Sequence, residues 1–371
     1  MKRNIIKTMS EEQVISGTII YGDEPRLIEG YLCIKDGIIT EVGPDLAVDA
    51  TLEGLVAPCF VNAHTHIGDS ILKDPPLLDL DSLVRPPHGL KHRILREMPA
   101  CDIEEAMGRT LTDMVQTGTG VFCDFREGGV KGASMLANAL SVSGGLTGMI
   151  MGRPQQPQRP GRGELDNLVE ICSGIGMSGV NDVPLEVLQE AVNTARRAGK
   201  PFAIHGGEKD TSDISGSIEL EPDHIVHMTH ALDTHIKQLV EADIPVVVCP
   251  RSNFVTGVGS PIRPPINRML ERGVTVAAGT DNVMLNSVNM FSEMEFLSKI
   301  YGLEDRQVFK MCTLNGARIL GLDERLGSIQ EGKQAKIMVL DDRSSNLSNS
   351  KNMLASFVRR GRPDDIQTII T

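Results

Sequence analysis

The sequence lacks tryptophan and has only three tyrosines among 371 residues, so it offers few aromatic rings for base stacking. It also lacks an excess of positive charge, because 37 Lys and Arg stand against 49 Asp and Glu, a formal net charge of -12. Proteins that bind single-stranded nucleic acid stack bases on aromatic rings, and nucleic-acid binders in general cluster positive charge. We therefore expect a small-molecule substrate and no nucleic-acid partner.

Long apolar runs are also missing. The longest uninterrupted stretches, such as Ile244–Pro250, are far shorter than the ~20 residues of a membrane-spanning helix. The first residues include Lys2 and Arg3 but no apolar segment before Ser10, unlike a secretory signal. The cysteines are odd in number and never spaced C-x-x-C, which argues against a disulfide framework or a zinc ribbon. We expect no membrane partner, and a cytoplasmic protein whose seven thiols are reduced: Cys33, Cys59, Cys101, Cys123, Cys172, Cys249 and Cys312.

The middle of the chain alternates apolar β runs with amphipathic helical runs, a pattern that indicates parallel βα units. Eight such units fit a closed (β/α)8 barrel, which usually takes about 250 residues. An open doubly wound sheet is the alternative, but no G-x-G-x-x-G follows the first strand. The expected strands are Leu55–Asn62, Gly120–Phe125, Leu146–Gly152, Glu170–Gly176, Pro201–His205, Asp223–Met228, Pro245–Cys249 and Thr275–Gly279.

Both ends of the chain are rich in β-forming residues. The N-terminal candidates are Gln13–Tyr21, Gly30–Lys35 and Ile38–Val42, and Asp36-Gly37 between the last two is a hairpin-turn signal. Ile337–Leu340 and Leu354–Arg359 are the C-terminal candidates. The interpretation is an α/β protein in which residues 1–57 and 323–371 form one small β-sandwich domain, and residues 58–322 form the barrel.

In such barrels the active site lies at the C-terminal ends of the strands, and His, Asp and Glu residues gather there. The first strand runs into His64-Thr65-His66, and residues two apart on an extended chain point to the same side. The two imidazoles can thus share a metal ion, although a bare H-x-H is weak evidence. Polar residues also follow the fifth, sixth and eighth strands: His205 and Glu208; His224, His227 and His230; Asp281 and Asn282.

These segments together resemble the amidohydrolase superfamily, and most closely its cytosine-deaminase/chlorohydrolase branch of metal-dependent hydrolases and deaminases. The resemblance covers nearly the whole chain in the expected order, and it is specific as an ensemble. The matching segments are 60–66 (FVNAHTH), 204–208 (IHGGE), 226–230 (VHMTH), 249–253 (CPRSN), 279–281 (GTD) and 327–333 (GSIQEGK).

The resemblance implies that His64, His66, His205 and Asp281 bind one divalent metal ion. Three neutral imidazoles and a carboxylate suit Zn2+ or Fe2+, and such an ion lowers the pKa of a bound water from 15.7 toward ~7. Binuclear relatives carry a bridging lysine or carboxylate at the fourth strand. Residues 171–177 contain no lysine, which favours a mononuclear site.

The resemblance also implies roles in proton transfer. Glu208 matches the carboxylate that shuttles protons, and His227 matches the histidine that positions the attacking water or the substrate. His224 and His230 flank His227, and either remains an alternative for that role. Asp281 can accept the proton of the water because it lies at the metal.

The substrate must be inferred from loops. Arg126 and Arg153 follow the second and third strands and are candidates to hold an anionic or hydroxyl-rich group, because the Arg fork matches carboxylate and phosphate. The alternative is that they are solvated loop charges. His230 and Asn282 are further candidate substrate-binding residues, and the long segment 67–99 is a candidate lid.

The leading hypothesis is hydrolytic deamination of a heterocyclic amidine, a purine-, pyrimidine- or nucleoside-like ring, by a metal-bound hydroxide. The enzyme would then be a hydrolase of carbon–nitrogen bonds other than peptide bonds. One alternative is hydrolysis of a cyclic amide or a chlorinated ring by the same metal chemistry. Another is a non-catalytic binding or assembly protein on the same barrel. A homo-oligomer is expected by analogy alone.

Overall fold

The computed structural model describes residues 6–7, 12–47 and 49–371 of the protein. Its larger sheet is parallel, in the order β13-β12-β11-β10-β9-β8-β7-β6-β14. The strands are β6 Phe60–His66, β7 Thr119–Arg126, β8 Thr147–Gly152, β9 Gly174–Met177, β10 Phe202–Gly206, β11 His224–His227, β12 Val246–Val248, β13 Val276–Ala278 and β14 Asp281–Asn282.

The sheet closes on itself through its last strand, which has two parts. β13 pairs with β12, and after only Gly279 and Thr280 the chain continues as β14, where Asp281 pairs with Thr65 of β6. Asn62 of β6 holds this junction, because its side chain accepts from the Thr280 backbone N–H at 3.0 Å and donates to Thr280 Oγ1 at 2.8 Å. We call this junction between β6, β13 and β14 the closing seam. The predicted barrel is confirmed.

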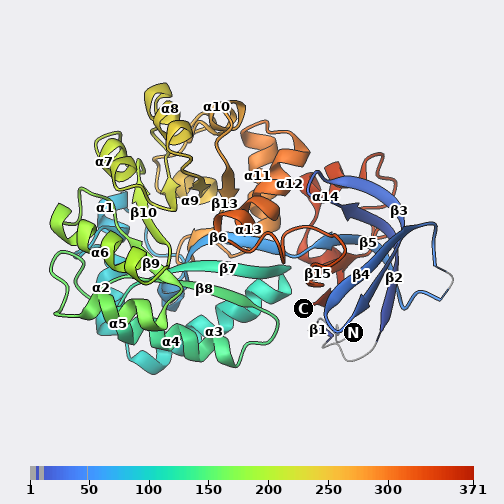
Figure 1. The fold of residues 1–371 in the computed structure, drawn as a ribbon, viewed down its shortest axis with the longest axis horizontal. Coiled ribbons are helices and arrows are strands. Elements are labelled where there is room, and N and C mark those ends of the chain that lie inside the picture. Colours follow the sequence, from blue (N-terminus) through green and yellow to red (C-terminus); the bar gives the residue numbers. More distant parts are fainter. Residues whose placement is uncertain (1–5, 8–11, 48) are drawn as a thin grey trace.

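Helices cover the outside of the barrel (Figure 1). Helix α6 shows why the sequence folds this way, since it buries Leu188, Ala191, Val192 and Ala195 at the spacing of one helical face. The covering helices are α3 Ala100–Gln116, α4 Gly129–Ser141, α5 Glu164–Ile171, α6 Leu185–Arg197, α7 Ile214–Glu219, α8 Asp233–Glu241, α9 Pro250–Val255, α10 Ile266–Glu271, α11 Met290–Ile300, α12 Asp305–Met311 and α13 Leu314–Ile319. No helix of the described residues is long and apolar enough to cross a membrane.

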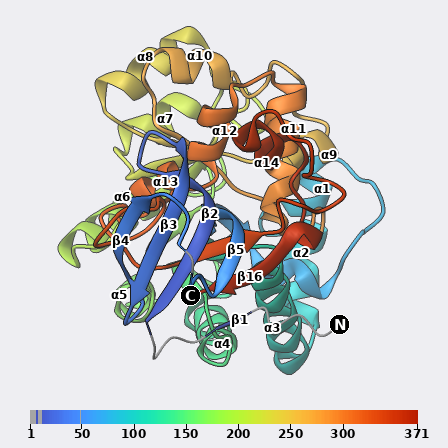
Figure 2. The same ribbon diagram turned by 90° about the vertical axis from the view of Figure 1, so that its right-hand side faces the viewer.

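Both ends of the chain build a second sheet beside the barrel, as predicted, and Figure 2 shows its blue and red strands together. It is a mixed sheet in the order β1-β16-β15-β5-β2-β3-β4. Asp36 and Gly37 both have positive φ, which the twist of a two-residue hairpin requires. The strands are β1 Ile6–Lys7, β2 Gln13–Tyr21, β3 Arg26–Lys35, β4 Ile38–Pro44, β5 Leu52–Pro58, β15 Ile337–Leu340 and β16 Ile366–Ile370.

One predicted strand is wrong. Leu354–Arg359 lies within helix α14, Met353–Arg360, whose first turn is capped by the side chain of Asn352. The buried residues are Leu354, Phe357 and Val358, spaced as on one helical face, and Phe357 packs on Phe291 of α11 and Phe309 of α12. Short apolar runs fit a strand or a helix equally well until their packing partners are known.

Two other predicted strands have different boundaries in the structure. The expected strand Leu55–Asn62 is split at Cys59, because β5 belongs to the small sheet and β6 to the barrel. The expected strand Glu170–Gly176 begins only at Gly174, since Glu170 and Ile171 end helix α5. The domain division at residues 57/58 and 322/323 stays a prediction.

Candidate metal centre and active site

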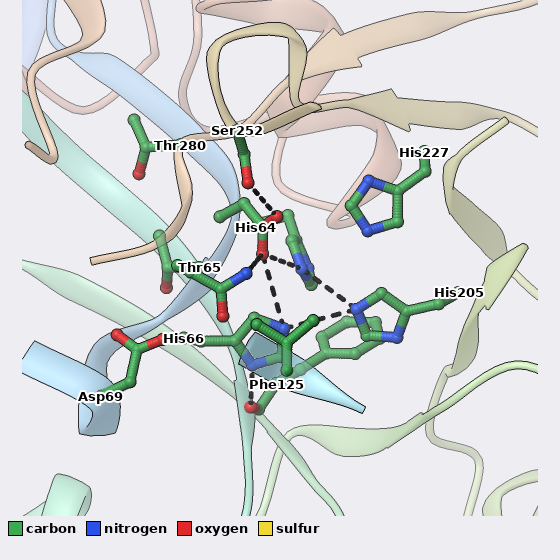
Figure 3. A network of polar contacts seen from close by, with 12 residues as sticks. His64, Thr65, His66, Asp69, Phe125, His205, His227, Ser252 and Thr280 are labelled. Atoms are coloured by element: carbon green, nitrogen blue, oxygen red, sulfur yellow. Dashed lines mark hydrogen bonds and ion pairs between the residues drawn. The ribbon is translucent and has the colours of Figure 1, made fainter. Parts of the chain in front are cut away.

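Four predicted ligands converge at the C-terminal end of the barrel. The Nε2 atom of His205 lies 3.3 Å from Nε2 of His64 and 3.3 Å from Nε2 of His66. The Oδ1 atom of Asp281 lies 3.5 Å from His64 Nε2 and 3.6 Å from His66 Nε2. A tetrahedral ion with ligand bonds of 2.0–2.1 Å requires donor atoms about 3.4 Å apart. These four distances match the spacing of donor atoms around one ion, and Figure 3 shows the imidazoles of His64, His66 and His205 turned toward one another.

The tautomers of His66 and His205 are also those that a bound cation requires. His66 Nδ1 lies 3.0 Å from the Phe125 carbonyl oxygen, and His205 Nδ1 lies 2.8 Å from the Met177 carbonyl oxygen. Carbonyl oxygens only accept hydrogen bonds, so each Nδ1 carries the proton and each Nε2 presents a lone pair. Lone pairs that face one another in a buried place repel unless a cation lies between them. The residues present thus fit a divalent metal ion.

Asp281 is held by neighbouring donors. Ser252 Oγ donates to its Oδ2 at 2.7 Å, and Asn282 Nδ2 donates to its Oδ1 at 3.0 Å. Burial alone would raise the pKa of Asp281, but the nearby imidazoles of His64, His66 and His227 keep it well below its usual range. The carboxylate is therefore ionised. Gly279 lets the strand approach this closely, since a Cβ there would lie 2.6 Å from the His64 backbone nitrogen.

His227 lies beside the ligand cluster, and its neighbours fix its tautomer. Thr229 Oγ1 donates to Asn253 Oδ1 at 3.1 Å, which turns the Asn253 amide nitrogen toward His227 Nδ1 at 3.3 Å. Because the amide nitrogen can only donate, Nδ1 accepts and the proton is on Nε2. That Nε2 lies 3.4 Å from Oε2 of Glu208.

The other histidines of this segment lie elsewhere. His224 is buried beneath the site, 6.0 Å from the ring of Phe125, and neither ring nitrogen has a hydrogen-bond partner. His230 accepts from Arg263 at 3.5 Å and does not line the cavity described below. The geometry therefore brings His227, and neither flanking histidine, to the ligand cluster.

Glu208 follows β10 and faces the same space. Burial raises the pKa of its carboxyl well above the usual range, and the charge of Asp281 adds to the shift. Its Oε1 is buried without a hydrogen-bond partner. A buried carboxyl group with a raised pKa beside a candidate metal site is suited to proton transfer.

A second polar cluster, which we call the inner wall, adjoins His66. At its centre is Glu127, whose Oε1 lies 2.8 Å from His66 Nδ1 and 2.6 Å from Lys91 Nζ. Lys91 also donates to Asn282 Oδ1 at 3.0 Å. Arg126 pairs with the other oxygen of Glu127, and Arg153 NH1 lies 3.6 Å from Oε1. Lys91 and Glu127 were assigned no role from the sequence.

These groups surround a cavity of about 190 Å³ at the barrel mouth. His66, His205, His227, Glu208 and Asp281 line it, as do the predicted substrate residues Arg153 and Asn282. Arg126 does not, because its fully buried guanidinium lies against Gly68 and pairs with Asp124 and Glu127.

The predicted lid segment covers the cavity. It contains a 3-10 turn Ile67–Ile71 and two helices, α1 Leu80–Val84 and α2 Leu90–Glu97. Ion pairs join α1 to loops across the mouth: Arg85 Nε to Asp182 Oδ1 at 3.1 Å, and Lys209 Nζ to Asp81 Oδ2 at 2.5 Å. We call these four residues the rim.

Comparison with known proteins agrees with this geometry. Residues 55–371 match the model of the amidohydrolase family. The chain belongs to this family. Among related amidohydrolases, it is 34% identical to a putative aminohydrolase of Methanothermobacter thermautotrophicus, over 93% of this chain and 97% of the relative. It is 25% identical to a 5-methylthioadenosine/S-adenosylhomocysteine deaminase of Thermoanaerobacter pseudethanolicus, over 100% of this chain and 91% of that protein.

The fold is also that of solved amidohydrolases. The crystal structure of an adenosine deaminase from Xanthomonas campestris with bound zinc superposes with a TM-score of 0.80 at 18% identity, over 95% of this chain and 90% of the other. The predicted enzyme class is therefore confirmed, and the alternative of a non-catalytic protein is not. This amidohydrolase is a hydrolase of carbon–nitrogen bonds other than peptide bonds.

Proposed function

We propose that the protein is a hydrolytic deaminase of an aminated heterocycle, with one divalent ion, Zn2+ or Fe2+, held by His64, His66, His205 and Asp281. The observation that carries the proposal is the buried Glu208 carboxyl, which has a raised pKa, lies 3.4 Å from His227 Nε2 and shares the cavity with three of the proposed metal ligands. When bound, such an ion lowers the pKa of a water and supplies a nucleophile near neutral pH.

The protein's own residues supply the proton transfers. Water adds to the ring carbon that carries the amino group, and Asp281 takes up the proton that the water loses. Glu208 donates a proton to the ring nitrogen, takes up the hydroxyl proton of the adduct and passes it to the amino group, which leaves as ammonia. The proton held by Asp281 then restores the Glu208 carboxyl group. The C–O bond formed replaces the C–N bond broken, and a ring carbonyl remains. The Nε2–H of His227 donates a hydrogen bond to the developing oxyanion.

Ammonia release over a panel of purines, pyrimidines and pterins tests this activity. We expect turnover of at least one amino-heterocycle by protein loaded with zinc or with iron, and none by protein stripped with a chelator. Halide release from chlorinated rings without ammonia release would instead identify a chloro-ring hydrolase. If neither the zinc-loaded nor the iron-loaded protein released ammonia from any compound of the panel, the proposal would be contradicted.

We further propose a cytoplasmic, homo-oligomeric enzyme. Seven free thiols, five of them buried, support a reducing compartment, and the oligomer rests on analogy between barrels. Sedimentation of the purified protein at micromolar concentration tests the oligomer, and a monomer would contradict it.

A further inference from the structure

The inner wall contains more positive than negative groups. Three cationic side chains, Lys91, Arg126 and Arg153, meet two carboxylates, Asp124 and Glu127. All five side chains are at least 95% buried. A buried charge without a counter-charge is costly, so structures retain one where a ligand supplies the opposite sign.

Neighbouring acids do not balance this excess. Asp69 lies close by, but burial raises its pKa to about 8, so it is mostly protonated at neutral pH. Asp182 is near Arg153 but is already paired with Arg85 of the rim at 3.1 Å. The three cations of the inner wall therefore share two carboxylates, which leaves an excess of one positive charge.

The unbalanced charge faces the cavity. Arg153 lines the cavity, is 3% exposed, and has an NH2 group without a hydrogen-bond partner. Ser178, which follows the adjacent strand β9, also lines the cavity, and its buried Oγ likewise has no partner. Lys91 lines the same space and approaches the same Glu127 oxygen as Arg153. Two cations and a hydroxyl thus converge where a ligand can reach them.

From this arrangement we propose that the substrate carries an anionic oxygen group, a carboxylate or a phosphate, bound by Arg153 and Lys91 with a hydrogen bond to Ser178. This rests on the proposed deaminase function and narrows its substrate class. The ammonium and the guanidinium supply the charge, and the unpaired NH2 group of Arg153 supplies a charged N–H donor. Because Glu127 also touches His66, the anion lies close to the reacting ring.

Calorimetric titration with matched ligand pairs tests the proposal independently of turnover. The titrated protein is zinc-loaded and carries Glu208→Gln, so that ligands are not consumed. Pterin against pterin-6-carboxylate and cytosine against 5-carboxycytosine test a ring-borne carboxylate, and adenosine against adenosine 5′-monophosphate tests a phosphate. We expect the anionic member of at least one pair to bind about 10- to 100-fold more tightly, as hydrogen bonds to a charged group imply.

Arg153→Met should abolish that preference, whereas the matched change Arg159→Met, at an exposed arginine of the same loop, should leave it intact. Lys91→Met should reduce the preference for the anionic ligand. If Arg153→Met does not fold, the Lys91→Met variant tests the anion site instead. Equal affinity within all three pairs, or a preference that survives both inner-wall variants, would overturn the anion site. Neither result depends on ammonia release, so failure of the deaminase proposal is recognised separately.

Discussion

The inner wall and the rim of one cavity use ion pairs in opposite ways. At the inner wall, Lys91 and Arg153 are almost fully buried around Glu127, beside a metal-ligand candidate. At the rim, the side chains of Arg85 and Lys209 are about half exposed and pair with Asp182 and Asp81. Buried pairs are strong and costly to break, whereas exposed pairs contribute little and exchange readily with water. The inner wall is therefore held by buried ion pairs that are costly to break, and the rim is held by exposed ion pairs that are easily broken.

The largest effect is expected at the floor of the cavity. Glu208→Gln removes the transferable proton but keeps the shape of the side chain, so kcat should fall by about 10²–10⁴-fold. Zinc content, measured by mass spectrometry, should stay the same because Glu208 is not among the proposed ligands. Glu219→Gln, at an exposed position of α7, is the matched control. A variant that keeps wild-type kcat would remove Glu208 from the mechanism.

A smaller effect is expected from the carboxylate behind His66. Glu127→Gln weakens the contact that orients the Nδ1–H of His66, and the loss of such a partner typically lowers metal affinity about 10–100-fold. Competition with a chromogenic zinc chelator measures this. Unchanged zinc affinity would show that Glu127 serves charge balance alone.

The lid should respond to acid through His92 of α2, whose Nε2 lies 3.1 Å from the Val84 carbonyl oxygen of α1. Burial lowers the pKa of His92 to about 3, against about 6.5 in an unfolded chain. The opened lid therefore binds a proton first, and closure weakens as pH falls below ~6.5, by at most about 1.4 kcal/mol per pH unit. Hydrogen exchange of residues 80–97 between pH 7 and 5 measures this.

His92→Gln should flatten the pH dependence, since the amide can still donate to Val84 but does not titrate. The same slope in the variant and the wild type would assign the acid response to another group.

The smallest effect is expected at the rim. Arg85→Met removes exposed pairs worth about 0.2–1 kcal/mol, so the melting temperature should change little. Because the mouth opens more readily, KM should change by a few-fold and lose its dependence on salt. Arg93→Met, at an exposed position of α2, is the control. A large loss of stability would show that the rim is structural.

The sequence predicted most of the barrel because eight parallel strands impose a strong alternation, and the rule that sites lie at strand ends located His64, His66, His205 and Asp281. The same rule was insufficient for Arg126. That residue also ends a strand, but its side chain turns onto Gly68 and two carboxylates, an orientation that spacing does not encode.

Contacts between distant segments were beyond prediction for a similar reason. Lys91 reaches Asn282 across 191 positions, and Asn253 sets the tautomer of His227 from helix α9, which follows the next strand. Lys91 lies in no recognised motif, and the segment 249–253 that contains Asn253 does not reveal which side chain Asn253 contacts. Helix α14 was mistaken for a strand because its apolar run is short and its packing partners lie in α11 and α12.

The closing seam has a consequence for how the site is completed during synthesis. Three imidazoles come from residues 64, 66 and 205, but the aspartate arrives only with residue 281, on the segment that joins the last strand to the first. Until Asn62 engages Thr280, the nascent chain lacks the fourth proposed ligand and the barrel is open. Tight metal uptake would thus require closure of the barrel at this seam.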